Sequence, residues 1–348
     1  MAELIWKGKS SPHRYSITEQ KHTIPPKAYQ LVTKEHYPPQ PENQQPQEPS
    51  VSPERWYNRL IHGDNQYILP ALLHEFAASI NLIYVDPPFM TGRTFINGTD
   101  VAYSDTWAND LDSYLPWLYD NLQLLYNLLS PTGSFYLHLD WRTIHYAKIM
   151  LDEIFGYNPH GNGPGFKNEI IWHYQSGGGQ SKNYYARKHD TILLYTKSAR
   201  YCFYPERVAE RRGTQKRNHM RKEINTDGRI SWTIRSAGRI YTYNEDSLII
   251  PSDVWSNINH LHQKDPERSG YATQKPEALL ERIILASSEQ HDLVLDCFCG
   301  SGVTPAVAER LNRRWIACDR SDIAIAKTRE RLLAQEMMHP FITQQING

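Results

Sequence analysis

Short apolar strands alternate with amphipathic helices along most of this chain, and this alternation limits its possible folds more than any other feature. Residues 81–85 form a continuous apolar run, the type of strand that a parallel sheet buries on both faces. Residues 111–129 then carry apolar side chains at helical spacing. The pattern returns after Pro276, where helical stretches alternate with strands at 293–296 and 314–319. The alternation predicts an α/β fold with a doubly wound, mostly parallel sheet.

The composition fits a domain of this kind and excludes several others. The chain has 348 residues, and its 38 Lys and Arg balance 38 Asp and Glu, so any anionic partner must meet a local patch. No apolar run approaches the roughly 18 residues of a membrane span. The first residues lack a secretory signal, and we expect a cytoplasmic protein with no membrane partner. The four cysteines form no CxxC pair, which indicates reduced thiols and no bound metal.

One stretch departs from this neutral balance. Residues 200–240 hold eleven Lys and Arg against four Asp and Glu, and they interrupt the α/β alternation. Such a stretch is often only a solvated surface, but it also suits contacts with phosphates. We therefore expect five segments: an extended or disordered Pro/Gln-rich segment at 1–55, one half of the domain at 56–199, a basic insertion at 200–265, the other half at 266–335, and a C-terminal tail at 336–348.

A glycine-rich turn follows the strand at 293–296. Asp296 ends the strand, and Gly300 and Gly302 allow a sharp turn and the close approach of a ligand to the backbone. The next strand ends in Asp319, where a carboxylate can accept hydrogen bonds from ribose hydroxyls. The turn lacks the third glycine of a dinucleotide fingerprint and the Lys-Ser/Thr of a phosphate-binding loop, which disfavours NAD and ATP. It predicts a site for another adenosine cofactor, with a plain strand–turn–helix as the alternative.

A second turn, at the end of strand 81–85, has the sequence Asp86-Pro87-Pro88-Phe89. Ligands of open parallel sheets bind at the carboxyl ends of the strands. The two prolines remove two backbone donors and stiffen the chain. The turn therefore presents hydrogen-bond acceptors beside an aromatic face, which suits a planar group that carries an NH2. A purely structural Pro-Pro turn is the alternative.

The two turns together resemble the motifs of the DNA amino-methyltransferases, which modify the exocyclic nitrogen of adenine or cytosine. Their DPPY or DPPF motif corresponds to residues 86–89, and their LDPFxGSG motif to residues 295–302. The catalytic motif comes first, as in the permuted β class, whose DNA-reading segment lies between the motifs, like residues 200–240 here. Further matches lie at 61–65, 188–195, 253–255 and 273–276, so that the resemblance covers about residues 56–335.

The resemblance implies a Rossmann-like fold of the S-adenosylmethionine-dependent methyltransferases with an inserted target-recognition region. It implies methyl transfer from S-adenosyl-L-methionine to adenine N6 in double-stranded DNA, on a base flipped out of the duplex. Cytosine N4 is the alternative target, although the cytosine enzymes of the family more often carry Ser in place of Asp86. A further alternative is a catalytically inactive DNA-binding subunit of a larger assembly. A restriction endonuclease is an optional partner, and both a monomer and a homodimer are compatible with the chemistry.

The same resemblance assigns residues to roles. Asp86 and the Pro87 carbonyl would accept hydrogen bonds from the amine, and Phe89 would stack on the base. Asp319 would hold the ribose, Asp64 would shape the adenine pocket, and Thr273 and Lys275 would lie near the methionine end. Base readout would fall to Arg235, Arg239 or Asn225. The implied sets are Asp86, Pro87, Pro88 and Phe89 for catalysis; Asp64, Thr273, Lys275, Asp296, Phe298, Gly300, Gly302 and Asp319 for the cofactor; and Arg211, Arg212, Lys216, Arg217, Arg221, Lys222, Arg235 and Arg239 for DNA.

Three positions depart from the family pattern. Cys297 stands in place of the usual proline, Val303 where threonine is common, and Met90 where asparagine often follows the DPPY or DPPF motif. These departures concern the fine geometry of the cofactor site and not the class of reaction.

Overall fold

The protein is described by a computed structural model. The structure describes residues 4–6, 9, 29–38, 56–97, 100–107, 110–175, 182–213, 219–226, 228–335 and 339–347. The sequence also has three consecutive glycines at 177–179, for which we expect a loop, and these lie outside the described residues.

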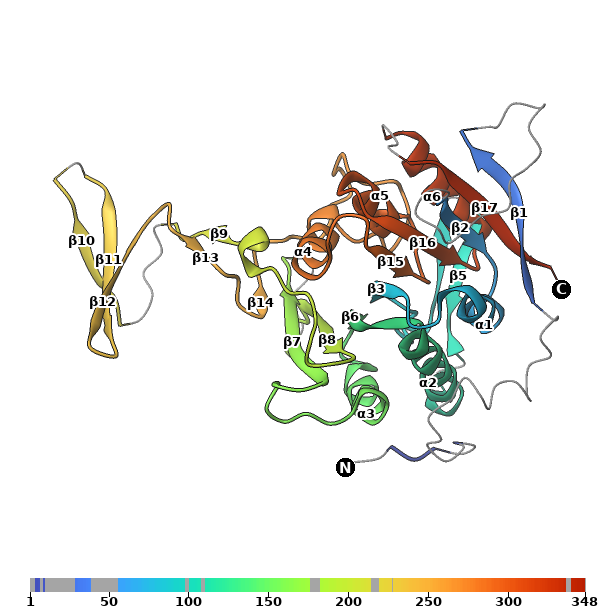
Figure 1. The fold of residues 1–348 in the computed structure, drawn as a ribbon, viewed down its shortest axis with the longest axis horizontal. Helices are drawn as coiled ribbons and strands as arrows, with labels where there is room; N and C mark the ends of the chain where they lie inside the picture. The colour runs from blue at the N-terminus through green and yellow to red at the C-terminus, as the bar shows by residue number, and fades with distance from the viewer. Residues whose placement is uncertain are drawn as a thin grey trace.

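A large, mostly parallel sheet forms the centre of the molecule (Figure 1). Its strand order within the described residues is β1-β17-β2-β16-β15-β3-β6-β8-β7-β14. Only the pairs β1–β17, β6–β8 and β7–β8 are antiparallel. The strands are β1 (Gln30–Tyr37), β2 (Asn58–His62), β3 (Ile80–Val85), β6 (Leu129–Leu139), β7 (Gly165–His173), β8 (His189–Thr196), β14 (Val254–Trp255), β15 (Leu293–Asp296), β16 (Arg314–Asp319) and β17 (Phe341–Asn347). The doubly wound α/β fold is confirmed.

Helices cover both faces of this sheet because the strands are apolar on both sides. The helices α1 (Asn65–Phe76), α2 (Leu111–Leu128) and α3 (Ile144–Phe155) pack on one face. The helices α4 (Glu277–Ser287), α5 (Val303–Arg310) and α6 (Asp322–Leu333) lie on the other (Figure 1). No helix in the described ranges is long and apolar enough to cross a membrane.

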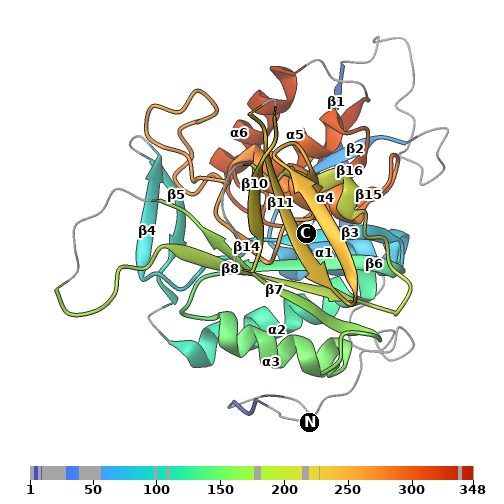
Figure 2. The ribbon, with the colours of Figure 1, turned by 90° about the vertical axis from the view of Figure 1, so that its left-hand side faces the viewer.

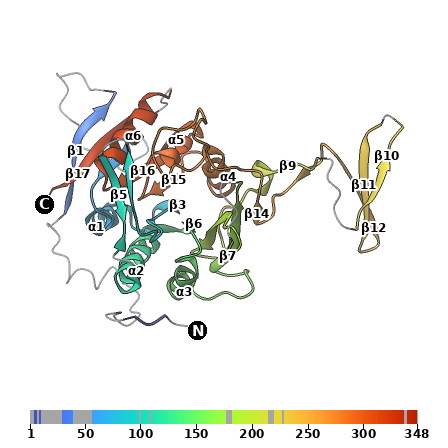
Figure 3. The ribbon, with the colours of Figure 1, turned by 180° about the vertical axis from the view of Figure 1, so that it is seen from behind.

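The ends of the chain contribute more to the sheet than we expected. The prediction of a C-terminal tail at 336–348 is wrong, because β17 lies between β1 and β2 as an inner strand. The expected N-terminal segment at 1–55 includes β1, which closes that end of the sheet (Figure 3). The two strands were overlooked because they are polar at several positions and flank stretches rich in proline or glutamine. Trp6 is also buried, against Tyr119 of α2.

The basic insertion leaves the body as an arm, defined here as residues 209–249. Its stalk is the strand pair β9 (Glu210–Arg211) and β13 (Leu248–Ile249), after the short 3-10 helix η4 (Pro205–Val208). Its tip is a three-stranded antiparallel sheet of β10 (Arg221–Ile224), β11 (Ile230–Ser236) and β12 (Arg239–Asn244). Figures 1 and 3 show the arm projecting from the end of the molecule opposite to β1. A separate hairpin, β4 (Arg93–Asn97) and β5 (Asp100–Asp105), follows the turn after β3.

The inner position of β17 makes a testable prediction about stability. Phe341 is fully buried, with its ring centroid 4.7 Å from Tyr37 and 5.7 Å from Trp315. We expect Phe341→Ala to lower the free energy of unfolding by about 3–5 kcal/mol in urea denaturation, because it leaves a cavity between two aromatic rings. Leu248→Ala, at an exposed position of the arm, should change it by less than about 0.5 kcal/mol. Equal effects of the two substitutions would contradict the role of β17.

Candidate active site

Two turns meet at one edge of the sheet because their strands are neighbours. β3 and β15 pair in parallel, with Leu82 opposite Val294 and Ile83 opposite Leu295. Their carboxyl ends therefore place the proline turn (residues 86–89) beside the glycine turn (residues 296–302). Both line an open pocket of about 1180 Å³. All the predicted catalytic residues line this pocket, and so does every predicted cofactor residue except Gly302. The residues concerned are Asp64, Asp86, Pro87, Pro88, Phe89, Thr273, Lys275, Asp296, Phe298, Gly300 and Asp319.

The proline turn is fixed from outside because its own residues offer few backbone donors. The Tyr114 hydroxyl donates to the Pro88 carbonyl at 2.8 Å. The buried Asp105 carboxylate accepts from the backbone N–H groups of Met90 and Thr91, each at 2.9 Å. This clamp holds Met90 in the left-handed region, at φ 61°. Asp105 and Tyr114 were not predicted, since their role depends on contacts across the fold.

Asp86 carries one paired and one unpaired oxygen. Its Oδ2 accepts from the Lys275 ammonium at 2.5 Å. Its Oδ1 is buried and accepts no hydrogen bond from the described residues, with His138 Nδ1 at 4.0 Å. The Phe89 ring lies beside this pair, with its centroid 5.2 Å from Lys275 Nζ. Buried acceptors normally have a donor, so this oxygen is a candidate to accept a hydrogen bond from a ligand.

Lys275 lines the pocket, and its ammonium binds the carboxylate of the proline turn. Its position near the methionine end of the cofactor stays a prediction. Lys275 and Asp86 are far apart in the sequence. They meet because the segment just before α4 packs against the end of β3.

A buried hydrogen-bonded group lies behind Asp86. His138 of β6 is fully buried, with Nδ1 2.8 Å from the Tyr84 hydroxyl and Nε2 3.2 Å from Asp190 Oδ2. Tyr174 donates to the other Asp190 oxygen at 3.0 Å. Burial acts to raise the pKa of Asp190, but His138, Lys275 and Tyr174 together outweigh it through hydrogen bonds and charge, and the pKa is lowered. The sequence signal that could have revealed this group is a histidine inside an otherwise apolar strand.

The glycine turn is organised by Asp296. One carboxylate oxygen accepts from the Phe298 N–H at 3.0 Å, and the other from the Thr304 hydroxyl at 2.5 Å. Burial raises the pKa of this carboxyl to about 7, and the two hydrogen bonds only partly oppose that rise. Thr304 was not predicted as a site residue, although it stands in the first turn of α5.

Asp319 holds the same turn from the next strand. Its Oδ2 accepts from the Gly300 N–H and its Oδ1 from the Ser321 N–H, each at 2.9 Å. Burial raises the pKa of this carboxyl as well. Gly302 has φ 75°, and a Cβ there would lie 2.7 Å from the Thr328 side chain. Only glycine fits this position, which gives α5 its entrance close to the sheet.

The remaining wall combines polar and aromatic groups. Asp64 caps α1 by accepting from the Gln66 N–H at 3.0 Å, and it also faces the pocket. The neighbouring Asn65 donates to the Cys297 carbonyl at 2.7 Å. Trp117 lies edge-on to Phe298, with centroids 5.7 Å apart. Trp117 was not predicted, because its spacing on α2 resembles that of an ordinary core position.

The arm carries most of the predicted DNA contacts on its surface. Arg211, Arg221, Lys222, Arg235 and Arg239 are exposed. Lys216 and Arg217 lie outside the described residues. The prediction that Arg212 contacts DNA at the surface is wrong, because this side chain is buried.

Arg212 is 6% exposed, and its guanidinium lies 5.0 Å from the Trp232 ring centroid. It stabilises the join between stalk and tip, because a buried guanidinium over an aromatic face ties the two parts together.

The sequence is similar to known DNA methyltransferases. Residues 80–329 match the DNA methylase family. The chain is 33% identical over 255 residues to the type II methyltransferase M.HpaI of Haemophilus parainfluenzae, covering 73% of this chain and 68% of the relative. It is 30% identical over 261 residues to the DNA adenine methyltransferase YhdJ of Escherichia coli (strain K12), covering 75% and 77%. The chain belongs to the DNA methylase family, and it is a DNA methyltransferase.

A solved structure shows the same fold at lower identity. The PvuII DNA methyltransferase, described as cytosine-N4-specific, superposes with a TM-score of 0.52 at 19% identity, over 81% of this chain and 89% of the other. This likeness supports the fold and carries no information on the target base.

The buried Asp296 predicts a pH dependence of stability. Its folded pKa of about 7 lies above its ordinary value of 3.8, so the native state retains a proton that the unfolded state releases. Stability should therefore fall as the pH rises through this window. We compare the free energies of unfolding of Asp296→Asn and the wild type by urea denaturation. The difference between them should grow in favour of Asp296→Asn by about 2–4 kcal/mol from about pH 5 to pH 8. The matched change Asp112→Asn, at an exposed position of α2, should show no such trend. If Asp296→Asn and the wild type differed in free energy of unfolding by the same amount at all pH values, the raised pKa of Asp296 would be contradicted.

Proposed function

We propose that this methyltransferase modifies N6 of adenine in double-stranded DNA. The observation that carries the proposal is the buried Asp86 Oδ1, an acceptor with no donor among the described residues, beside the face of Phe89. A flipped base whose NH2 donates to Asp86 while its ring lies on Phe89 satisfies both features. The aspartate favours adenine, because the cytosine enzymes that the motif resembles more often carry serine there. The relative YhdJ is itself described as a DNA adenine methyltransferase.

The methyl donor is S-adenosyl-L-methionine, and the pocket fits it. Gly300 and Gly302, with φ 51° and 75°, keep the backbone of the glycine turn bare of side chains. Asp319 offers carboxylate lone pairs to hydroxyl groups, and Asp64 and Phe298 offer a polar edge and an apolar face. The cofactor supplies an activated methyl group on a cationic sulfur, so the chain needs no covalent nucleophile.

The residues of the proline turn act on the amine. An exocyclic nitrogen is a poor nucleophile because its lone pair is delocalised into the ring. The Asp86 carboxylate and the Pro87 carbonyl accept its two N–H groups, which favours a pyramidal nitrogen with its lone pair directed into the pocket. The same carboxylate stabilises the positive charge that develops on the nitrogen. The clamp on Met90 and Thr91 keeps these acceptors in place during the reaction.

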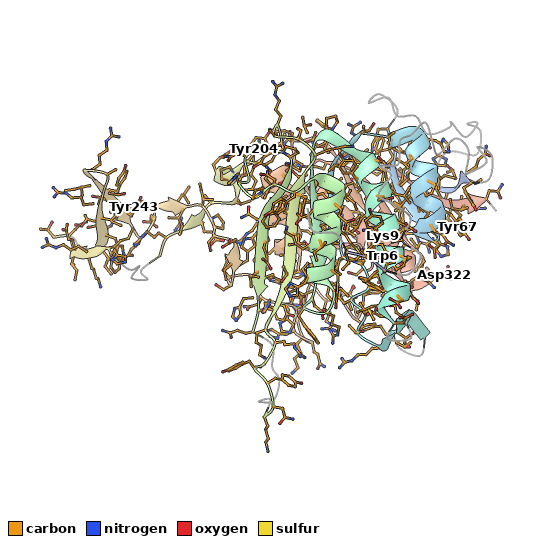
Figure 4. The ribbon with its side chains drawn as sticks, turned by 90° about the horizontal axis from the view of Figure 1, so that it is seen from below. Trp6, Lys9, Tyr67, Tyr204, Tyr243 and Asp322 are labelled. Atoms are coloured by element: carbon orange, nitrogen blue, oxygen red, sulfur yellow. The ribbon has the colours of Figure 1, made fainter. Side chains whose placement is uncertain are left out.

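The arm provides the main surface for the duplex. Arg221, Arg235 and Arg239 stand on the exposed tip, and Figure 4 shows Tyr243 of β12 well clear of Tyr204 in the body. A small antiparallel sheet of this size can enter a groove of DNA. Figure 2 looks along the arm from its tip, with β10, β11 and β12 nearest the viewer. One copy can modify each strand in turn, so neither a homodimer nor a restriction endonuclease partner is required.

The reaction is tested by expressing the chain in a host without adenine methylation and sequencing its DNA with base-resolution detection of modified bases. N6-methyladenine in one recurring motif is the expected result. N4-methylcytosine would keep the mechanism and overturn the choice of base. The absence of any modified base, with cofactor binding intact, would favour an inactive DNA-binding subunit.

Asp86→Ala should abolish methylation in the same host, with a loss of at least about 10³-fold in single-turnover rate, because the acceptor for the amine is gone. Calorimetric binding of S-adenosylhomocysteine should survive, since Asp86 does not hold the adenosine. Asp322→Ala, on the exposed surface of α6, is the matched control and should methylate like the wild type. Turnover retained by Asp86→Ala would overturn the catalytic assignment.

The arm makes a separate prediction about DNA affinity. Arg235→Ala and Arg239→Ala should each reduce the slope of log affinity against log salt by about one, because each removes a positive charge that releases a counterion from the DNA. Arg329→Ala is a matched control, since Arg329 pairs with Glu35 at the β1 end of the molecule. Unchanged slopes in an Arg235/Arg239 double variant would show that the tip does not contact the DNA backbone.

A further inference from the structure

A cation stacked on two aromatic rings lies on the surface of the body, outside the pocket and the arm. The Arg187 guanidinium is 3.8 Å from the ring centroid of Trp141 and 4.7 Å from that of Tyr184. All three residues are exposed, with Trp141 at 44% and Tyr184 at 60%. We call them the Arg187 stack. The two rings hold at the surface a guanidinium that would otherwise sample many rotamers.

The fold places the Arg187 stack at the same edge of the sheet as the pocket. Trp141 comes two residues after the end of β6, and Arg187 two residues before the start of β8. Because β6 is parallel to β3 and antiparallel to β8, these two ends lie at the edge where the proline turn follows β3.

His138 gives the distance from the stack to the reacting end of the pocket. Its Nδ1 is 4.0 Å from Asp86 Oδ1, and it precedes Trp141 by three residues. Three residues span at most about 11 Å along the chain. The Arg187 stack therefore lies close to the mouth of the pocket, whereas the tip of the arm is far from it (Figure 1).

The charge of Arg187 is not neutralised by the described part of the chain. Arg142, which lies 5.0 Å from the same Trp141 ring, pairs with Asp140. Arg187 makes no ion pair and no hydrogen bond with any described residue. Residues 182–188 hold two further lysines and no Asp or Glu. The surface beside the pocket mouth is therefore locally basic in a chain of zero net charge.

A stacked guanidinium keeps its N–H donors free to bind an anion, because these donors lie around the edge of its plane and not on its faces. Two parallel N–H groups of this kind match the oxygens of a phosphate. A phosphate bound here also costs less side-chain entropy than one bound by a mobile arginine, since the rings already fix the guanidinium. The chemistry of the Arg187 stack is thus that of a preformed phosphate site.

We propose that Arg187, held by Trp141 and Tyr184, binds a backbone phosphate of the DNA at the mouth of the pocket, as a contact separate from the arm. The inference rests on the proposed function, because it takes the duplex as the partner. A base that enters the pocket turns about its own backbone, which brings the neighbouring phosphates to the pocket mouth. The contact positions the strand and carries no sequence information.

The test measures the affinity of the full chain for a short labelled duplex of mixed sequence, by fluorescence anisotropy at several salt concentrations with S-adenosylhomocysteine present. Arg187→Ala should weaken binding roughly tenfold, because it removes a charged hydrogen-bond donor. It should also reduce the slope of log affinity against log salt by about one. Arg187→Lys should retain the slope and still bind more weakly than the wild type, since an ammonium lacks the paired donors.

Trp141→Ala separates stacking from charge. It leaves every charge in place and should keep the slope, while the loss of the ring that holds Arg187 weakens binding roughly threefold. The matched controls lie at the opposite edge of the sheet. Arg200→Ala, beyond the other end of β8, and Tyr157→Ala, before the start of β7, are both at exposed positions and should leave affinity and slope unchanged. Calorimetric binding of S-adenosylhomocysteine shows that each variant is folded.

Three results would overturn the proposal. One is an unchanged slope in Arg187→Ala, and another is an equal loss of slope in Arg200→Ala, which would mean that any surface charge has this effect. The third is a change of molecular mass in light scattering for Arg187→Ala with unchanged DNA affinity, which would make the stack an interface with a second copy of the chain.

The failure of this proposal can be told apart from failure of the proposed function. The assay needs no turnover and no recognition sequence. A wild type that binds the duplex while Arg187→Ala binds it equally well loses the phosphate site alone, and methylation of adenine in cells is unaffected. A wild type that binds no duplex and modifies no base would remove the proposed function and this contact together.

Discussion

The parallel pairing of β3 with β15 is the constraint on which the rest of the site depends. The two strands come from opposite halves of the sequence, and their register aligns Ile83 with Leu295. Because the pair is parallel, both strands end at the same edge, and the residues that follow must share one pocket. An antiparallel pair would have sent the proline turn and the glycine turn to opposite edges. This pairing brings the two turns together. The hydrogen bonds of Asp105, Asp64 and Asp319 then fix the backbone around them.

The pocket has an unusual charge for a cavity within a neutral chain. Five carboxylates line it, those of Asp64, Asp86, Asp105, Asp296 and Asp319, against the two basic side chains Lys275 and Arg320. Burial raises the pKa of both Asp296 and Asp319, which shows that the fold tolerates these acids at a cost. An excess of negative charge suits a cationic methyl donor and an amine that becomes cationic.

The arm is structurally separate from the body that holds the pocket. The body has a deep core, whereas the tip of the arm buries little beyond Trp232. The arm therefore gains stability from its stalk and from Arg212, whose guanidinium lies over Trp232 and near Tyr243. Such a tip can change its surface residues without disturbing the catalytic turns, since no strand of the central sheet passes through it.

The sequence by itself determined the fold class, the two turns and their order, because these depend on local patterns: apolar strands, Gly302 where no Cβ fits, and two prolines after Asp86. It did not determine contacts between distant segments. The place of Lys275 on Asp86, the group of His138, Tyr84 and Asp190, the burial of Arg212 and the strand β17 all arise from packing across the sheet. The reason is physical: a side chain's type and spacing fix its local conformation, whereas its partner is chosen by which strands lie side by side.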